Sequence, residues 1–370
     1  MSEVVDIRAA GDPREVVDRA VRLLQEGELV AVPTETVYVI VASGLQPAAM
    51  QKLSQTIDPT ATNPLALMLS DPQQALDYIP NMPPLGRKLA RRCWPGPVTI
   101  VFDIALDLGL LHELPSEVKH VVQTDGRLPL RVPSHGAVRS VLRLMPEPLF
   151  SAREPLVGAS SAAELNDRFG DQVALVIDDG ECRYGKTSTV VGVTNDGWKL
   201  MESGVVTETM LVRLASEVYM FVCTGNTCRS PMAEGFFRKF LAERLQCGED
   251  DLLDRGYVVL SAGLAAASGA PASPESVAVA SQLGVDLHGH TSQPLHDRLL
   301  DQADHIYTMT KGHLNSILAA RPDLAARVKL LSQNEEDVSD PIGGDAAQYE
   351  YCQQEIERHL RVIIGSIAAQ

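Results

Sequence analysis

The segment that most constrains the fold runs from Val218 to Leu245. The apolar run Val218–Val222 predicts a buried strand, the small residues after it predict a tight loop, and Pro231 suits the first turn of a helix that continues to Leu245. Strand and helix patterns then alternate to the end of the chain, which is typical of a doubly wound parallel sheet. The further strands are expected at 257–261 and 305–308, and the further helices near 274–283, 314–319 and 347–367.

The first half of the chain predicts a second, mixed α/β domain. Residues 13–26 place apolar side chains on one helical face, and Gly27 ends that helix. At 370 residues the chain is about twice the common single-domain size, so two domains are expected. Their boundary falls around 207–216, where we expect a short helix. Strands of the first domain are expected at 29–32, 98–102, 128–132, 173–177 and 189–193.

Composition and charge exclude several classes of protein. With 32 Lys and Arg against 48 Asp and Glu, the net charge is −16, which disfavours broad electrostatic attachment to nucleic acid or to an anionic membrane. No apolar run approaches ~18 residues, so no membrane span is expected. The start, M-S-E-V-V-D-I-R, lacks a basic and then apolar leader, so we expect a cytoplasmic protein. The six cysteines form no C-x-x-C pair and no Cys/His zinc spacing, so reduced thiols and no metal site are expected.

The loop 223–230, C-T-G-N-T-C-R-S, has the residues of a phosphate-binding site with a nucleophile. The preceding strand delivers Cys223 to the carboxyl edge of the sheet, where open α/β folds bind ligands. Small residues let successive backbone N–H groups surround an anion, and the start of the next helix adds positive potential. Arg229 supplies a fork matched to phosphate oxygens, and the same positive field favours Cys223 as a thiolate nucleophile.

Asp340, in V-S-D-P-I-G-G, is the best candidate for a proton donor to the leaving group. Pro341 stiffens this loop, and the glycines after it allow a close approach to the site. Asp-Pro-x-Gly alone predicts only a turn, but together with the cysteine loop it indicates a general acid.

The segment 221–234, F-V-C-T-G-N-T-C-R-S-P-M-A-E, resembles the signature of low-molecular-weight protein phosphatases. S-A-G at 261–263, G-H-T-S at 289–292 and D-P-I-G-G at 340–344 match in order and spacing, so the resemblance covers a whole domain, which we place at 217–370. It implies a doubly wound fold and a protein phosphatase that needs no metal and no cofactor.

The same resemblance implies a role for each residue of the loop. Cys223 attacks phosphorus and forms a cysteinyl-phosphate, Arg229 binds the equatorial oxygens, and Asp340 acts first as acid and then as base. His290 is expected to orient a loop by hydrogen bonding rather than to catalyse. Asn226 holds the loop in shape, and Ser230 hydrogen-bonds the sulfur. The phosphate-binding set implied for this chain is Thr224, Gly225, Asn226, Thr227, Cys228 and Ser230.

Two positions bear on the phosphorylated residue. Tyrosine-directed members usually carry a larger aliphatic residue where this loop has Thr227, and aromatic residues after Asp-Pro. Here Ile342, Gly343 and Gly344 follow, which resembles the protein-arginine phosphatase branch. We therefore expect a phosphorylated protein as substrate and phosphoarginine as its target, with protein-tyrosine phosphatase as the alternative.

The positions of the cysteines bear on two further reactions, arsenate reduction and disulfide formation. A related arsenate reductase needs two relay cysteines on a mobile downstream segment, whereas only Cys247 and Cys352 follow Cys228, so that activity is not expected. Cys228 is close enough to Cys223 in a curled loop for a reversible disulfide on oxidation. A small packing residue is the alternative interpretation of Cys228.

In the first half, V-P-T-E-T-V-Y at 32–38 matches the P-T-[DE]-T-x-Y signature of the threonylcarbamoyl-AMP synthase (YrdC-like) family. Further motifs of that family follow in order over about 12–208. The resemblance implies a twisted α/β sheet around a positive cavity for ATP, threonine and bicarbonate, and the fold is also associated with double-stranded RNA binding. The cavity positions that match are Thr34, Thr36, Arg131, Ser151 and Ser188.

This half departs from the family where phosphates should bind. The expected K-G-R-P reads I-D-P-T at 57–60, S-A-N reads S-A-R at 151–153, and a late arginine is Glu202. Without those cations triphosphate binding is electrostatically unfavourable. We therefore expect residues 1–212 to form a degenerate, non-catalytic domain, either a module for a smaller ligand or a packing scaffold. The alternative is that it retains synthase activity or binds nucleotide or double-stranded RNA.

Overall fold

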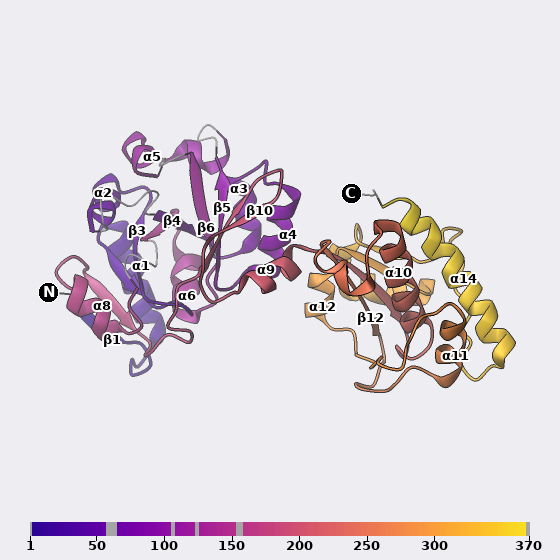
Figure 1. Ribbon diagram of the computed structural model, residues 1–370. Coiled ribbons are helices and arrows are strands. Elements are labelled where there is room, and N and C mark those ends of the chain that lie inside the picture. Colours follow the sequence, from indigo (N-terminus) through magenta and orange to yellow (C-terminus); the bar gives the residue numbers. More distant parts are fainter. Residues whose placement is uncertain (1, 57–64, 105–107, 123–125, 153–157, 368–370) are drawn as a thin grey trace. The chain divides into compact units, whose positions relative to one another are not determined.

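The structure is a computed structural model that describes residues 2–56, 65–104, 108–122, 126–152 and 158–367. The chain divides into two compact units, Met1–Leu211 and Val212–Gln370. The helix expected around 207–216 is present as α9, Glu208–Ala215 (Figure 1).

The second unit is built on a parallel sheet of four strands in the order β12-β11-β13-β14. This confirms the doubly wound parallel sheet predicted for the second half. The strands are β11 Glu217–Cys223, β12 Tyr257–Gly263, β13 His305–Thr308 and β14 Val328–Leu330. The helices are α10 Arg229–Leu245, α11 Pro274–Gln282, α12 Asp297–Gln302, α13 Lys311–Ala320 and α14 Ala346–Gly365, with short 3-10 helices at Glu249–Leu252 and Pro322–Leu324.

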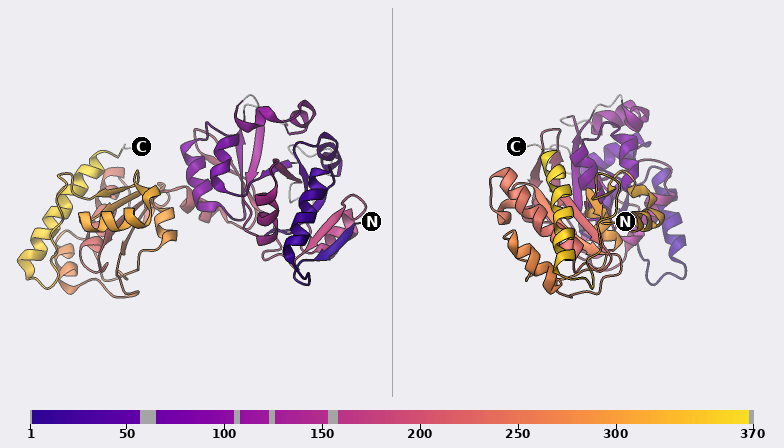
Figure 2. Two further views of the ribbon diagram at one scale, coloured as in Figure 1. Left: turned by 180° about the vertical axis from the view of Figure 1, so that it is seen from behind. Right: turned by 90° about the vertical axis from the view of Figure 1, so that its right-hand side faces the viewer.

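Both faces of this sheet are covered because successive residues of β11 enter two different cores. Tyr219 and Phe221 pack in one core with α10, α11 and α14, whereas Met220 and Val222 pack in the other with α12 and α13. A central parallel strand is buried on both sides, so it is apolar throughout rather than alternating. Figures 1 and 2 show α14 (yellow) alongside α10, which it contacts.

The first unit contains a mixed sheet of ten strands in the order β1-β8-β2-β3-β7-β4-β6-β5-β9-β10. Parallel and antiparallel neighbours both occur, since β2 pairs with β8 in parallel and with β3 in antiparallel register. The strands are β1 Glu3–Asp6, β2 Val30–Val32, β3 Val39–Ser43, β4 Leu65–Met68, β5 Val98–Asp103, β6 Arg127–Arg131, β7 Leu149–Ala152, β8 Leu175–Asp178, β9 Thr189–Val193 and β10 Trp198–Glu202.

Helices α1, Pro13–Gln25, and α6, Gly136–Leu144, contact each other and share one core with strands β2, β3 and β8. Asp12 caps α1 by accepting from the backbone N–H of Arg14, and Pro13 occupies its first turn. The other helices of this unit are α2 Pro47–Thr56, α3 Ala75–Tyr78, α4 Pro84–Cys93, α5 Ser116–Val122 and α8 Ala162–Phe169, with 3-10 helices at Pro72–Gln74 and Gly109–Glu113.

Two general features of the described residues bear on function. None of their helices is long and apolar enough to cross a membrane. Nor do the side chains in these ranges bring together three or more His, Cys, Asp or Glu residues in a group that could hold a metal ion.

Candidate active site

Strand β11 ends at Cys223 and helix α10 begins at Arg229, so the five residues between them form the tight loop that the sequence predicts. Cys223 is buried at the base of this loop, with 3% of its surface exposed. Its Sγ lies 2.9 Å from Ser230 Oγ and accepts a hydrogen bond from the backbone N–H of Asn226 at 3.2 Å. The sulfur thus has two polar neighbours within the loop, Ser230 and Asn226.

Asn226 has φ +54°, in the left-handed region, and its side chain is fully buried. Its Nδ2 donates to Ser230 Oγ at 2.9 Å and to Ser261 Oγ at 2.8 Å, while its Oδ1 accepts from the backbone N–H of Gln293 at 2.9 Å. His290 Nε2 lies 2.8 Å from the Asn226 carbonyl oxygen, to which its N–H donates. One asparagine therefore ties the loop to β12 and to the segment 289–293.

The end of β12 presses against the loop. A Cβ added at Gly263 would lie 2.6 Å from the Thr224 carbonyl oxygen and 2.9 Å from the Asn226 nitrogen, so this position admits only glycine. Ser261 Oγ donates to Glu234 at 2.6 Å, and burial raises the pKa of that carboxyl group. Neither Ser261 nor Glu234 is predicted from the sequence to have a role, because no local pattern indicates that α10 and β12 share this contact.

Arg229 and Asp340 meet although 111 positions separate them. Arg229 Nη2 lies 2.5 Å from Asp340 Oδ2, and its Nη1 donates to the Val338 carbonyl oxygen at 3.4 Å. The arginine side chain is 5% exposed and the aspartate side chain 46% exposed. The structure therefore brings the two predicted charged residues together, with the carboxylate on the open side.

His313 on α13 was not anticipated from the sequence. Its Nε2 shares a hydrogen bond with Thr224 Oγ1 at 2.9 Å and its Nδ1 shares one with Thr310 Oγ1 at 2.9 Å. Burial and the nearby charge of Arg229 lower the pKa of His313. A neutral imidazole bonded at both nitrogens fixes the residue that follows Cys223.

Of the remaining loop residues, Thr227 and Cys228 face a different set of partners, and Gly225 lies between Thr224 and Asn226. Cys228 Sγ lies 3.7 Å from Thr227 Oγ1 and 3.5 Å from both Ser273 Oγ and Tyr349 Oη. Burial raises the pKa of Tyr349 to about 12. Both Cys223 and Cys228 are free thiols here, so a disulfide between them on oxidation stays a prediction.

In the first unit, three of the five predicted cavity residues bond directly. Thr34 Oγ1 lies 2.7 Å from Thr36 Oγ1, and Arg131 Nη2 donates to Thr36 Oγ1 at 2.8 Å and to Glu35 Oε1 at 2.9 Å. The second Glu35 oxygen accepts from the backbone N–H of Ser134 at 2.9 Å. Burial pushes the pKa of Glu35 upward, but the charge of Arg131 and its hydrogen bond outweigh this, so the pKa is lowered.

The other two predicted cavity residues lie farther apart: Ser151 is on β7, Ser188 directly precedes β9, and β4, β6 and β5 lie between those two strands in the sheet. Ser188 Oγ is 2.8 Å from Thr99 Oγ1 of β5, and Ser151 Oγ donates to the Ala66 carbonyl oxygen at 3.4 Å. The positions at which phosphate-binding cations were expected, 57–60, and Arg153 lie outside the described residues.

Comparisons with known proteins match each half of the chain separately. The low molecular weight phosphotyrosine protein phosphatase model matches residues 218–370. The protein-arginine-phosphatase of Geobacillus stearothermophilus is 35% identical over 142 residues, 37% of this chain and 87% of that protein. The probable low molecular weight protein-tyrosine-phosphatase EpsP of Ralstonia solanacearum is 33% identical over 151 residues, 40% of this chain and 95% of that protein.

The Sua5/YciO/YrdC model, described as telomere recombination, matches residues 22–204. The threonylcarbamoyl-AMP synthase of Pyrococcus abyssi is 32% identical over 180 residues, 47% of this chain, so the chain spans half the length of that relative. The solved structure of a doubly substituted Sua5 from P. abyssi is similar in fold, with 22% identity, a TM-score of 0.50 and coverage of 70% of this chain and 91% of that one. Residues 22–204 are thus similar to the Sua5/YciO/YrdC family, and through residues 218–370 the chain belongs to the low molecular weight protein phosphatase family of hydrolases.

Proposed function

We propose that the C-terminal unit hydrolyses phosphorylated proteins through a cysteinyl-phosphate, and that its target is phosphoarginine. The observation that carries the mechanism is the surroundings of the Cys223 sulfur, 2.9 Å from Ser230 Oγ and 3.2 Å from the Asn226 nitrogen. A buried thiol with these two partners, at the end of a strand whose loop leads into helix α10, is suited to act as a nucleophile and then to leave.

The proposed reaction has two displacement steps. The Cys223 sulfur attacks phosphorus, and the bond from phosphorus to the substrate nitrogen breaks as Asp340 gives that nitrogen a proton. Water then attacks the cysteinyl-phosphate and gives a proton to Asp340, which releases phosphate and restores the thiolate. Arg229 carries the charge of the phosphoryl oxygens in both steps, and Ser230 stabilises the departing sulfur.

Asp340 fits this role by its position. Its carboxylate lies 2.5 Å from the Arg229 guanidinium and remains 46% exposed, so it borders the phosphate loop while still reaching solvent. A general acid has to meet both the leaving group and the water that later replaces it.

Selection of phosphoarginine rests on Thr227 and on the loop after Asp340. Ile342 is 71% exposed and Gly343 has φ +74°, so this loop offers no aromatic wall for a phenyl ring. The arginine-directed and tyrosine-directed relatives have nearly equal identity to this chain, 35% and 33%, so overall similarity does not choose between them.

The test is the ratio of kcat/KM values for phosphoarginine and phosphotyrosine peptides with the full-length protein. We expect the parent protein to prefer phosphoarginine and Thr227→Ile to shift the ratio toward phosphotyrosine by about tenfold or more. Thr209→Ile, the same substitution at an exposed position of α9, is the matched control. Cys223→Ser, which lacks the nucleophile, gives the background rate of phosphate release. A parent preference for phosphotyrosine would discard the specificity proposal and leave the cysteine mechanism standing.

For the first unit we propose a domain without synthase activity. The observation that favours this is that Arg131 already bonds Glu35 and Thr36, so the guanidinium is partly neutralised by a buried carboxylate. Incubation with ATP, threonine and bicarbonate should yield no threonylcarbamoyl-adenylate by mass spectrometry. Detection of that product in amounts that depend on Arg131 would establish the alternative, a retained synthase.

A further inference from the structure

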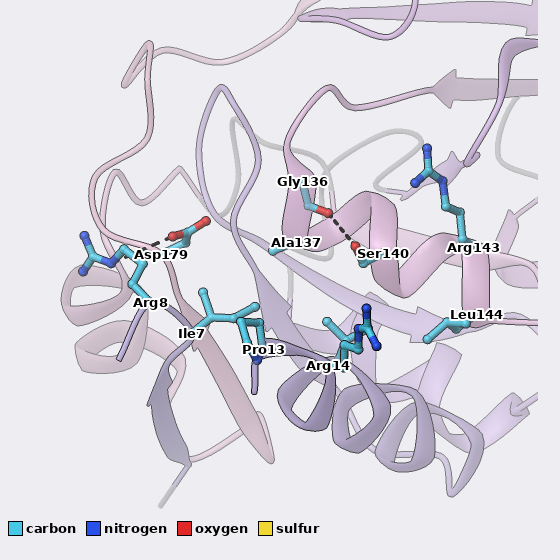
Figure 3. A pocket seen from close by; sticks show the side chains of 11 residues that line it. Ile7, Arg8, Pro13, Arg14, Gly136, Ala137, Ser140, Arg143, Leu144 and Asp179 are labelled. Atoms are coloured by element: carbon cyan, nitrogen blue, oxygen red, sulfur yellow. Dashed lines mark hydrogen bonds and ion pairs between the residues drawn. The ribbon is translucent and has the colours of Figure 1, made fainter. Parts of the chain in front are cut away.

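A cavity of about 580 Å³ opens between helices α1 and α6 of the first unit (Figure 3). This volume lies within the range of small-molecule sites, which is roughly 300–1,000 Å³. None of the residues that line it belongs to the polar cluster of Thr34, Thr36 and Arg131, so it is a separate feature.

The floor of the cavity is apolar and formed by core residues. Ile7, Val17 and Ala137 line it, and all three are buried members of the core that α1 and α6 share with the sheet. Pro13 adds a further apolar wall at the first turn of α1. A surface of this kind favours the burial of an apolar group of a ligand.

The rim carries three arginines and one carboxylate. Arg8 is partly neutralised, since its Nε lies 3.3 Å from Asp6 and 3.9 Å from Asp179, and Asp179 also lies 3.4 Å from His135. Arg14 and Arg143 stand on the two helices, and among the described residues no carboxylate lies within 4.0 Å of either guanidinium. Figure 3 shows Arg8 and Asp179 at one end of the cavity and Arg143 at the other.

This excess of positive charge is unusual on a chain of net charge −16. Arg14 and Arg143, one from each wall and neither with a carboxylate partner in the part of the chain that the structure describes, give the rim uncompensated positive charge that favours an anionic ligand. An organic anion fits this cavity better than an inorganic ion does, because an inorganic ion would leave the apolar floor exposed to water.

We propose that this cavity binds a small amphiphilic organic anion, with its charged head held by Arg14 and Arg143 and its apolar body on the Ile7–Val17–Ala137 floor. The ligand class is an aromatic or short aliphatic group that carries one phosphate, sulfonate or carboxylate. The site is independent of the phosphatase activity proposed for the other unit.

The test uses two dyes with the full-length protein and follows fluorescence. The first, 8-anilinonaphthalene-1-sulfonate, carries the anionic head, and the second, N-phenyl-1-naphthylamine, lacks it. We expect the Arg14→Gln/Arg143→Gln double variant to bind the sulfonate dye about tenfold or more weakly, because each guanidinium gives a charge-assisted hydrogen bond. Binding of the neutral dye by the same variant should change by less than about twofold. Arg22→Gln, an exposed arginine of α1 that does not line the cavity, should leave both dyes unaffected.

Two further measurements make the test decisive. Ser140→Trp places a large ring at the cavity wall and should abolish binding of both dyes, with circular dichroism confirming that the variant is folded. Phenylphosphonate should displace the sulfonate dye at concentrations where inorganic phosphate does not. The proposal is wrong if the double variant binds the sulfonate dye as the parent does, if both dyes weaken equally in it, or if inorganic phosphate competes as well as phenylphosphonate.

Discussion

Replacement of Asn226 provides the strongest test of how the phosphate loop is held. Two variants separate two effects: Asn226→Gly removes the side-chain hydrogen bonds but retains freedom at φ +54°, whereas Asn226→Ala also places a Cβ in the left-handed region. Both act at a fully buried position, so water cannot readily replace the lost partners.

The expected magnitude follows from the contacts of this side chain. It makes hydrogen bonds of 2.9, 2.8 and 2.9 Å to Ser230, Ser261 and the Gln293 backbone, and at about 1 kcal/mol each their loss gives about 3 kcal/mol for Asn226→Gly. The left-handed backbone costs alanine a further ~1 kcal/mol, which glycine avoids and asparagine tolerates, so Asn226→Ala should lose about 4 kcal/mol.

The assay is amide hydrogen exchange of peptides from β11 in the full-length chain, read by mass spectrometry, since it reports the opening free energy of this unit alone. Asn315→Ala, an exposed asparagine on α13, is the matched control and should change nothing. The reasoning is refuted if the glycine variant opens within about 1 kcal/mol of the parent, or if the glycine and alanine variants coincide.

Three further predictions test other parts of the molecule. Glu35→Gln leaves the buried Arg131 without its carboxylate and should destabilise the first unit by about 3 kcal/mol. Urea unfolding followed by tryptophan fluorescence measures this loss, because both tryptophans lie in that unit. An unchanged unfolding midpoint would contradict the prediction. The pKa of His313 is lowered in the folded state, so between that pKa and the unfolded value of 6.5 the folded unit binds fewer protons than the unfolded chain. The stability contributed by this residue should therefore be complete above pH 6.5 and fall as the pH drops below it. Hydrogen exchange, corrected for the intrinsic exchange rate at each pH, should show a flatter pH dependence for His313→Gln. Peroxide treatment should link Cys223 to Cys228, and mass spectrometry that finds Cys223 overoxidised without that link would rule out a redox switch.

Much of the fold is predictable from local pattern. Strands β9 and β13 begin and end at the predicted residues because each is a short, distinct apolar run, and α1 differs by one residue because Pro13 and Gly27 mark its ends. The mixed sheet of the first unit was less predictable. There, β1 is largely exposed, and in the second unit β14 has only three residues, so neither strand carries a pattern distinct from a loop.

Some residues of the candidate site are likewise predictable from the sequence, and others are not. Cys223, Asn226 and Arg229 lie in one short segment of the sequence, and their small neighbours indicate an anion-binding loop without a structure. The contact of His313 with Thr224 spans 89 positions, and only the parallel order of β11 and β13 brings them together. Side chains that shape a loop from other strands leave no local pattern by which to find them.

The dependence of the loop on Gly263 limits how this chemistry is transferred to another protein. An engineer who transplants the eight residues 223–230 alone would place them against a host strand with a Cβ, 2.6 Å from the Thr224 carbonyl oxygen. The smallest portable unit is therefore discontinuous: the loop with the start of α10, the end of β12, and the turn that holds His290 and Gln293. Scaffolds for such a graft should be searched by the spacing of two adjacent parallel strands rather than by loop length.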